Sequence, residues 1–482
     1  MKHLKFLLMA ILALFAFTAC SEQAQMVQQT DVISITLSDE GIALSEETDA
    51  VYTAQDIVYY EAGKDFTYGE GEKEDEHTAE EAAAHTVVHI TQPGTYSISG
   101  KLSKGQIAVD LGKDAKEDPE AVVTLILNGV DITCEVAPAV IFYNVYECGT
   151  EKASKDVDTS AAGANVILAE GTANNVHGSY VARIYKPDSV ELNDAGTEVV
   201  DSKKLHKYDA AFYSKMSMNM DGSGTLNIYA ENEGLDSELH LTLNGGNINI
   251  VSGNDGINTN EDGVSVTTVN GGNLNILVTG QTGEGDGIDS NGWLVINGGT
   301  VIAQACAFSA DAGIDSDMGI HINGGTVIAT GSMLDHIEEG GQTYAVFNFA
   351  QKQNGGETVR FKDQDGNAVL EHSPVNAYSV LIFSSPKLES GTYTLWSDEQ
   401  QLSGQSGGGM GFMGGGPDGM GRPGGFDRPE GMTPPDGFEP PEGMTPPMGG
   451  QRPGGRWESG ETGEASLEFK IVDGGNMFSV TK

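Results

Sequence analysis

Two short motifs decide the fold, Gly256-Ile257-Asn258-Thr259 and Asn270-Gly271-Gly272, because each has three counterparts along the chain. The counterparts alternate in order, with starts at Gly234, Asn244, Gly256, Asn270, Gly287, Asn297, Gly313 and Asn323. The closest Gly-x-[Asp/Asn] starts lie 22 residues apart, and the other two intervals are 31 and 26 residues. A unit of about 22 residues that recurs with short insertions is typical of a solenoid.

Each unit contains short alternating segments, such as residues 239–243, 247–251 and 256–259. Gly and Asn separate these segments, and both residues suit turns that need a positive φ. Three short strands in about 22 residues predict an all-β fold, a single-stranded parallel β-helix. Residues 125–130 look like an earlier coil of the same helix.

The chain resembles the clostridial-type carbohydrate-binding β-helix proteins, a family once catalogued as a domain of unknown function. The resemblance rests on residues 90–100 (Ile-Thr-Gln-Pro-Gly-Thr-Tyr-Ser-Ile-Ser-Gly), 105–107, 125–130 and the Asp-Gly-Ile repeats, and it covers roughly residues 86–400. It implies a right-handed parallel β-helix shaped like a polysaccharide lyase. It also implies calcium bound along the helix and affinity for plant polysaccharides such as cellulose and pectic acids, without implying catalysis.

The charge of the chain restricts its partners. Seventy acidic residues against 26 basic ones give a formal net charge of −44. Nucleic acid is excluded as an expected partner, because little in the chain would neutralise phosphates. Most of the acids, such as those in residues 70–81, are expected only to solvate an exposed surface. The acids of the repeat are different, because they recur at fixed positions.

Carboxylates gather around the glycine that starts each Gly-x-[Asp/Asn] unit. Successive coils place equivalent atoms about 4.8 Å apart, so a cation midway lies about 2.4 Å from each carboxylate, the distance calcium prefers. The candidate calcium ligands are Glu233, Asp236, Asp255, Asp286, Asp289, Asp315 and Asp317. The alternative is structural, since such an Asp can also accept hydrogen bonds from its own turn. The asparagines at 244, 270, 297 and 323 are expected to form an internal amide ladder and to make turns.

The N-terminus predicts export. Lys2 and Lys5 precede an apolar run at residues 6–17, which is too short for a membrane span. Cys20 follows Ala19, as in a lipoprotein signal, although Phe17 stands where that motif usually has Leu. We therefore expect lipidation at Cys20 and a membrane-anchored protein at the bacterial cell surface, the alternative being an ordinary cleaved signal.

Three cysteines remain after Cys20. A disulfide between Cys134 and Cys148 is possible in an exported protein, but buried thiols are favoured for these two and for Cys306.

The domain organisation follows from composition. Residues 404–463 are built of Gly, Pro and Met and cannot bury a core, whereas residues 465–472 alternate like a strand. The expected divisions are a signal peptide at 1–20, a tether and cap region at 21–85, the carbohydrate-binding β-helix at 86–340, a C-terminal β region at 341–403, a disordered loop at 404–463 and a final strand segment at 464–482.

Two functions of different classes fit, and a third is structural. The first is non-catalytic, calcium-assisted binding of a polysaccharide such as cellulose or polygalacturonic acid. The second is a calcium-dependent polysaccharide lyase, with Lys207 or Lys215 as the base. No Lys or Arg occurs between Glu231 and Ala350, so the best-formed coils offer no base, and binding is favoured. The third is a surface adhesin or envelope spacer.

Overall fold

The computed structural model describes residues 32–55, 57, 79–148, 154–179, 190–201, 208–407 and 465–482. The predictions for residues 1–20, for Lys207 and for most of the Gly/Pro/Met-rich segment lie outside this part of the chain. The described residues are mostly β, with one short α-helix, α2 (Ala79–Ala83), and one 3-10 helix, η2 (Ala115–Glu117). The chain divides into two compact units, Met1–Gly341 and Gln342–Lys482.

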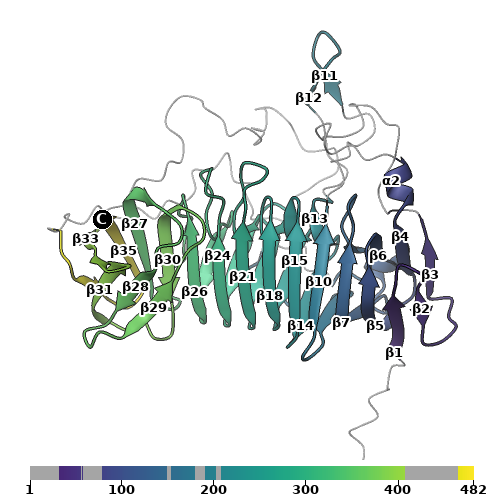
Figure 1. Ribbon diagram of the computed structural model, residues 1–482, viewed down its shortest axis with the longest axis horizontal. Coiled ribbons are helices and arrows are strands. Elements are labelled where there is room, and N and C mark those ends of the chain that lie inside the picture. The colour runs from purple at the N-terminus through teal and green to yellow at the C-terminus, as the bar shows by residue number, and fades with distance from the viewer. Residues whose placement is uncertain are drawn as a thin grey trace, which may run out of the picture. The chain divides into compact units, whose positions relative to one another are not determined.

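Three parallel ladders of strands build the first unit. The first ladder consists of β1 (Val32–Leu37), β5 (Gly94–Leu102), β7 (Val123–Thr133), β9 (Ala164–Leu168), β14 (Met218–Gly222), β17 (Leu241–Leu243), β20 (Val266–Val269), β23 (Trp293–Ile296) and β25 (Gly319–Ile322). The second ladder starts at the end of β7 and continues with β10 (Ala173–Gly178), β15 (Thr225–Ala230), β18 (Asn247–Ser252), β21 (Asn273–Val278), β24 (Thr300–Gln304) and β26 (Thr326–Gly331). Figure 1 shows the second ladder as a row of neighbouring strands.

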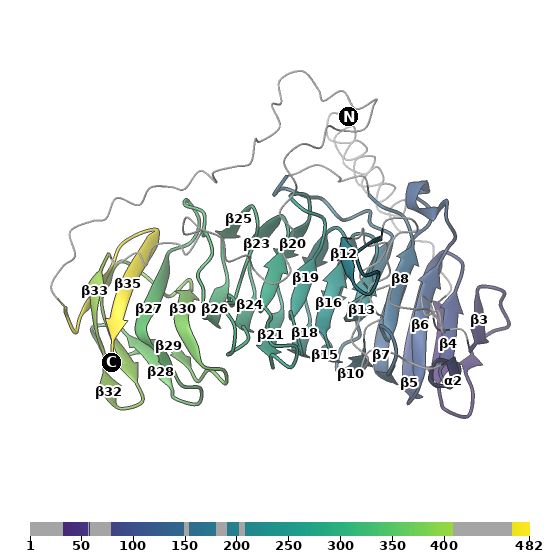
Figure 2. The same ribbon diagram turned by 90° about the horizontal axis from the view of Figure 1, so that it is seen from above.

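The third ladder is the one that carries the acidic repeat. Its strands are β4 (Thr86–Ile90), β6 (Gly105–Asp110), β8 (Val140–Asn144), β13 (Ala210–Ser214), β16 (Glu233–Ser237), β19 (Ile257–Thr259) and β22 (Ile288–Ser290). The row from β4 to β19 is visible in Figure 2. Short antiparallel partners flank the ladders: β3 (Val51–Ala54) pairs with β4, and β2 (Ala43–Leu44) pairs with β1. A separate hairpin joins β11 (Glu191–Leu192) to β12 (Val199–Asp201).

We call one strand from each ladder, taken in chain order, a coil. From β14 to β22 the strands visit the three ladders in strict rotation, and each strand from β14 to β19 pairs in parallel with its counterpart one coil later. This order is consistent with the predicted solenoid. The core consists of aliphatic side chains stacked in register, for example Ile228, Ile250 and Ile276, each at most 1% exposed. Such stacks bury apolar surface continuously along the coils.

The two repeated motifs differ in structure. The Asn-Gly-Gly motifs are turns, as predicted: the second Gly of each has a positive φ, as at Gly272 (+79°). In three of four cases the Gly-x-[Asp/Asn] motif lies in or directly before a short strand of the third ladder, which agrees with the strand predicted at residues 256–259 and not with a turn. Their glycines serve close packing, because a Cβ on Gly256 would lie 2.6 Å from the carbonyl oxygen of Gly287.

The asparagine ladder forms, but on the surface. Asn270 donates to Asn244 at 2.8 Å, Asn297 to Asn270 at 2.9 Å and Asn323 to Asn297 at 2.8 Å. All four side chains are exposed, so the prediction that the ladder is internal is wrong. They stand at the corner between the first and second ladders, where the chain turns and the side chains point away from the core.

The second unit contains two groups of strands. One comprises β27 (Tyr344–Gln353), β30 (Tyr378–Ser384), β33 (Ser403–Ser406) and β35 (Gly475–Thr481). The other comprises β28 (Val359–Lys362), β29 (Ala368–His372), β31 (Gly391–Ser397), β32 (Gln400–Gln401) and β34 (Phe469–Ile471). Phenylalanines from both groups pack together, with the ring centroids of Phe347 and Phe361 5.1 Å apart and those of Phe469 and Phe478 5.1 Å apart. The segment between β33 and β34 therefore separates strands that meet in one folded unit.

The three described cysteines are free thiols. Cys134 and Cys306 are buried, as predicted, whereas Cys148 is half-buried. Among the described residues, no helix has the length and apolar character needed to cross a bilayer.

Candidate metal centre

The third ladder holds its acidic side chains in register. Ile257 and Ile288 point into the core, and the next residue on each strand points to the opposite side. On that side Asn258 pairs with Asp236 of one neighbouring coil and with Asp289 of the other. The glycine packing described above lets the backbones approach closely enough for these side chains to stack.

Three of the seven predicted ligands meet in one cluster. Asp286, Asp289 and Asp315 each offer a carboxylate oxygen, and these oxygens all lie within 4.8 Å of one another. Asp286 is 6% exposed and the other two are half-buried. The backbone N–H of Asp315 donates to the carbonyl of Ile288 at 2.7 Å, which extends the third ladder beyond β22 and places Asp315 beside Asp289.

The other predicted ligands take part in hydrogen bonds around the cluster. Asp255 accepts the backbone N–H of Asp286 at 2.7 Å. The side-chain amide of Asn258 donates to Glu233 at 3.1 Å, and that of Asn260 donates to Asp236 at 2.8 Å. The backbone N–H of Asp317 donates to the carbonyl of Ser290 at 3.0 Å. These four residues lie outside the cluster of three.

Burial and mutual repulsion make the ionised cluster costly. Burial raises the pKa of Asp286 well above its usual range, and the neighbouring charges of Asp255, Asp315 and Asp289 raise it further. Burial, followed by the charges of Asp289 and Glu233, raises the pKa of Asp255 in the same direction. The pKa of Asp315 rises to about 8, again mainly through burial. A bound cation would offset both causes, because it replaces lost hydration and cancels the repulsion.

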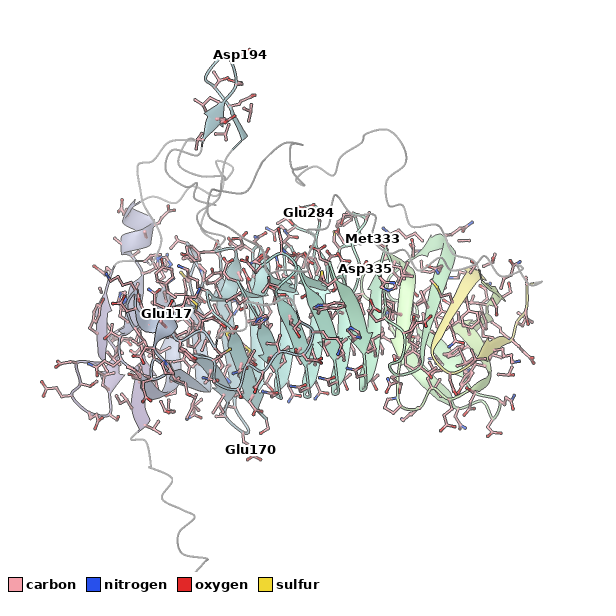
Figure 3. The ribbon with its side chains drawn as sticks, turned by 180° about the vertical axis from the view of Figure 1, so that it is seen from behind. Glu117, Glu170, Asp194, Glu284, Met333 and Asp335 are labelled. Atoms are coloured by element: carbon pink, nitrogen blue, oxygen red, sulfur yellow. The ribbon has the colours of Figure 1, made fainter. Side chains whose placement is uncertain are left out.

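Sequence reasoning missed a fourth carboxylate, Asp335. Its carboxylate accepts the backbone N–H of Ser316 at 3.1 Å and is hydrogen-bonded to that of Asp315, contributing to the raised pKa of Asp315. Two carboxyl groups that hydrogen-bond to each other share a proton, and a cation bound between them would take its place. Asp335, labelled in Figure 3, belongs to a coil that has lost the Gly-x-Asp motif. Its position 20 residues after Asp315, close to the repeat length, is the signal that could have found it.

An amide oxygen also lacks a partner beside the cluster. Asn258 is 8% exposed, and its Oδ1 is buried with no hydrogen-bond partner among the described residues. An unpaired buried carbonyl of this kind costs about 1–3 kcal/mol unless something binds it. The atoms available to bind a metal are thus carboxylate and amide oxygens, which suit a hard cation of the calcium type rather than a thiophilic metal.

Around β13 the third ladder carries aromatic and basic side chains in place of the acidic cluster. The Tyr213 hydroxyl donates to Glu238 at 2.7 Å, and Lys215 places its ammonium 4.2 Å from the centre of the Tyr143 ring. Lys215, one of the two candidate lyase bases, is therefore engaged with an aromatic ring and lies several coils before Asp315. The other candidate, Lys207, lies outside the described residues.

Comparisons with known proteins identify the family of the chain. Residues 84–355, more than half of the chain, match the family model of carbohydrate-binding domain-containing proteins. The chain therefore belongs to the carbohydrate-binding domain-containing protein family. A protein of the same description from Acetivibrio thermocellus is 31% identical over 165 residues, which cover 34% of this chain and 44% of that relative. The match thus spans less than half of the relative's length. No solved structure matches the chain.

Proposed function

We propose that this chain is a surface-anchored, non-catalytic protein that binds plant-type polysaccharides with the help of calcium, on a right-handed parallel β-helix. The observation that carries the proposal is the cluster of Asp286, Asp289 and Asp315 on the repeat of a chain from a carbohydrate-binding family. Calcium would be held by these three carboxylates, with Asp335 and the Oδ1 of Asn258 as further oxygen donors. The N-terminal lipid at Cys20 belongs to the proposal on the sequence pattern alone.

Charge supports a role for the ion in binding as well as in folding. The stretch between Glu231 and Ala350 contains 16 acidic residues and no Lys or Arg, so it repels a polyanion such as polygalacturonic acid. A calcium ion with open coordination positions can bind protein carboxylates and a sugar carboxylate together. A neutral glucan such as cellulose would not need the ion, because it can bind through aromatic stacking and hydrogen bonds.

Catalysis is not supported by the described residues. A lyase needs a base beside the metal, yet every Lys and Arg is missing from the coils that carry the cluster. Lys215 directly follows β13, which is three strands away from β22 in the third ladder, and it contacts Tyr143. No described residue favours the third function, that of a surface adhesin or envelope spacer.

Retention on immobilised polygalacturonate tests the proposal. We expect the full chain to be retained in millimolar calcium and at least tenfold more weakly in chelator. The double variant Asp289→Asn/Asp315→Asn should be retained no better in calcium than the native chain in chelator. Glu284→Gln is the matched control, because Glu284 is an exposed acid between β21 and β22 that lies outside the cluster.

Two results would count against the proposal. Retention that is equally strong with and without calcium would remove the ion from binding. Accumulation of unsaturated uronate, read as ultraviolet absorbance during incubation with polygalacturonate, would replace binding by elimination.

A further inference from the structure

The three ladders of the first unit present different outward faces. The face of the first ladder is covered at β14 and β17, where Asn219 and Thr242 are at most 9% exposed and the Thr159 hydroxyl hydrogen-bonds to their side chains at 2.6 and 2.7 Å. The third ladder holds the acidic cluster. On the second ladder, the outward side chains of β10, β15, β18 and β21 are exposed or half-buried (Figure 1). This face is therefore open, and the cluster does not involve it.

The outward side of these four strands carries no acidic or basic side chain apart from one histidine, and we call it the neutral face. Three positions from each strand make it up: Ala173, Asn175, His177, Thr225, Asn227, Tyr229, Asn247, Asn249, Val251, Asn273, Asn275 and Leu277. Burial lowers the pKa of His177 below its usual range, so its ring is uncharged near neutral pH. In a chain of net charge −44, this absence of Asp and Glu distinguishes the neutral face from the acidic repeat.

Charged residues border the neutral face. Asp131 on β7 pairs with Asn175, and its carboxylate lies 3.0 Å from the ammonium of Lys101. Glu231 directly follows β15 and accepts the Ser179 hydroxyl at 2.6 Å. These two acids have partners within the chain, and the repeat from residue 231 to 350 adds no basic residue. The surroundings therefore disfavour an anionic ligand and leave an uncharged one unaffected.

Rows of asparagines order the polar part of the neutral face. The Nδ2 of Asn227 donates to Asn175 at 2.9 Å, and that of Asn249 donates to Asn227 at 2.9 Å. In a neighbouring row Asn273 donates to Asn247 at 2.7 Å. A side-chain amide has two N–H groups and an oxygen with two lone pairs, so each amide can make further hydrogen bonds. Sugar hydroxyls, which both donate and accept, match these rows, whereas an apolar protein surface would leave the amides unpaired at a cost.

Tyr229 adds an aromatic surface to the neutral face. The rings of His177 and Tyr229 are stacked, with centroids 4.5 Å apart and planes 14° from parallel. His177 thus covers one face of the Tyr229 ring, and the other is turned toward β18, where Tyr229 pairs with Val251. Tyr229 is 43% exposed, and the side chain of Val251 is shorter, so the sheet steps down beside the ring. Asn249 lies two residues before Val251 on the same side of β18.

We propose that the neutral face binds an uncharged polysaccharide without a metal ion, and that Tyr229 and Asn249 contact it. One sugar ring packs against the free face of Tyr229 above Val251, and its hydroxyls hydrogen-bond with the Asn249 amide. Equivalent positions recur about every 4.8 Å along the ladder, so further amides are spaced regularly for the next sugars of an extended chain. This inference rests on the proposed function, because it assigns a face to the binding of neutral polysaccharide, and it uses no residue of the acidic cluster.

Calorimetry of the full chain in chelator tests the inference. The probes are cellohexaose, which is uncharged, and the hexamer of galacturonic acid, which is anionic and equally long. We expect cellohexaose to bind at least about tenfold more tightly than the anionic hexamer. Tyr229→Ala should weaken cellohexaose binding by about tenfold and Asn249→Ala by about threefold, while Tyr229→Phe should keep most of the affinity.

Tyr52→Ala is the matched control. Tyr52 is 50% exposed and also stacks on a histidine, His89, with ring centroids 4.4 Å apart, but it lies on β3, outside the neutral face. This variant should bind cellohexaose like the native chain. Melting curves of all variants establish that they are folded.

Failure of this inference can be told apart from failure of the proposed function. Asp289→Asn/Asp315→Asn should bind cellohexaose like the native chain, and Tyr229→Ala should keep calcium-dependent retention on polygalacturonate. If folded Tyr229→Ala and Asn249→Ala bind cellohexaose like the native chain, the neutral face is not the site, although the chain still binds carbohydrate. The inference is also overturned if the native chain does not bind cellohexaose in chelator, or binds the anionic hexamer equally well. Retention on polygalacturonate in calcium then tests the proposed function by itself.

Discussion

Asp289→Asn should change the stability of the chain in opposite directions with and without calcium. Asp289 has two acidic neighbours, Asp286 and Asp315, with carboxylate oxygens within 4.8 Å. At that distance and an effective dielectric of 20, each pair of charges repels by roughly 3.5 kcal/mol. Proton uptake and solvent relieve part of this, so the variant should gain roughly 1–3 kcal/mol of unfolding free energy in chelator at pH 8.

Calcium should reverse the order. At a hundredfold excess over Kd, the ion stabilises the native chain by about 2.7 kcal/mol, or about 4 °C in Tm for a unit of this size. The variant has lost a ligand and should gain little. The two melting curves, followed by far-ultraviolet circular dichroism or calorimetry, should therefore exchange places when calcium is added.

Glu284 provides a control for the loss of one negative charge at Asp289. Glu284→Gln removes one negative charge from an exposed position between β21 and β22. Calcium should stabilise this variant as much as it stabilises the native chain. Equal stabilisation of native chain and Asp289→Asn by calcium would place the ion elsewhere. Lower stability of the variant in chelator would show that the cluster is not held under repulsion.

Three further predictions concern protonation, packing and anchoring. In chelator the unfolding free energy should fall as pH rises from about 4 to about 8. The reason is that Asp315 keeps its proton up to a pKa of about 8 in the folded chain, whereas the unfolded chain releases it near 4. Asp315→Asn should flatten this dependence in melting curves measured over a pH series. Gly272→Ala should lower stability by about 1–3 kcal/mol in denaturant titrations, because it combines a positive φ with a Cβ 2.6 Å from the Gly246 carbonyl, whereas Gly263→Ala, with a similar φ and open space, should cost less. Cys20→Ser should move the protein from the detergent phase to the aqueous phase, and equal partitioning would remove the lipid anchor.

The repeat made the strand pattern predictable. Residues 247–251 were expected to be a strand and lie in β18, and residues 256–259 overlap β19, which begins at Ile257. The glycine of the Gly-x-[Asp/Asn] motif was harder to interpret, because a glycine needed for positive φ and one needed for close packing look alike in sequence. Only the approach of the next coil, as between Gly256 and Gly287, distinguishes them.

The site was predictable only in part. Register along the coils could be read from the spacing, and it brought Asp289 and Asp315 together. The spacing does not distinguish acids that could bind a cation from acids that accept local hydrogen bonds, as Asp255 does from Asp286. Asp335 was also missed, because the last coil keeps the acid but lacks the Gly-x-[Asp/Asn] motif of the earlier coils.

A crystal structure of the chain with calcium and a galacturonate oligosaccharide tests the central claim most directly. We predict an ion bound by Asp286, Asp289 and Asp315, with a sugar carboxylate completing its coordination shell and the oligosaccharide intact. An oligosaccharide bound to the acidic repeat without an ion, or an ion held away from these three residues, would contradict the account.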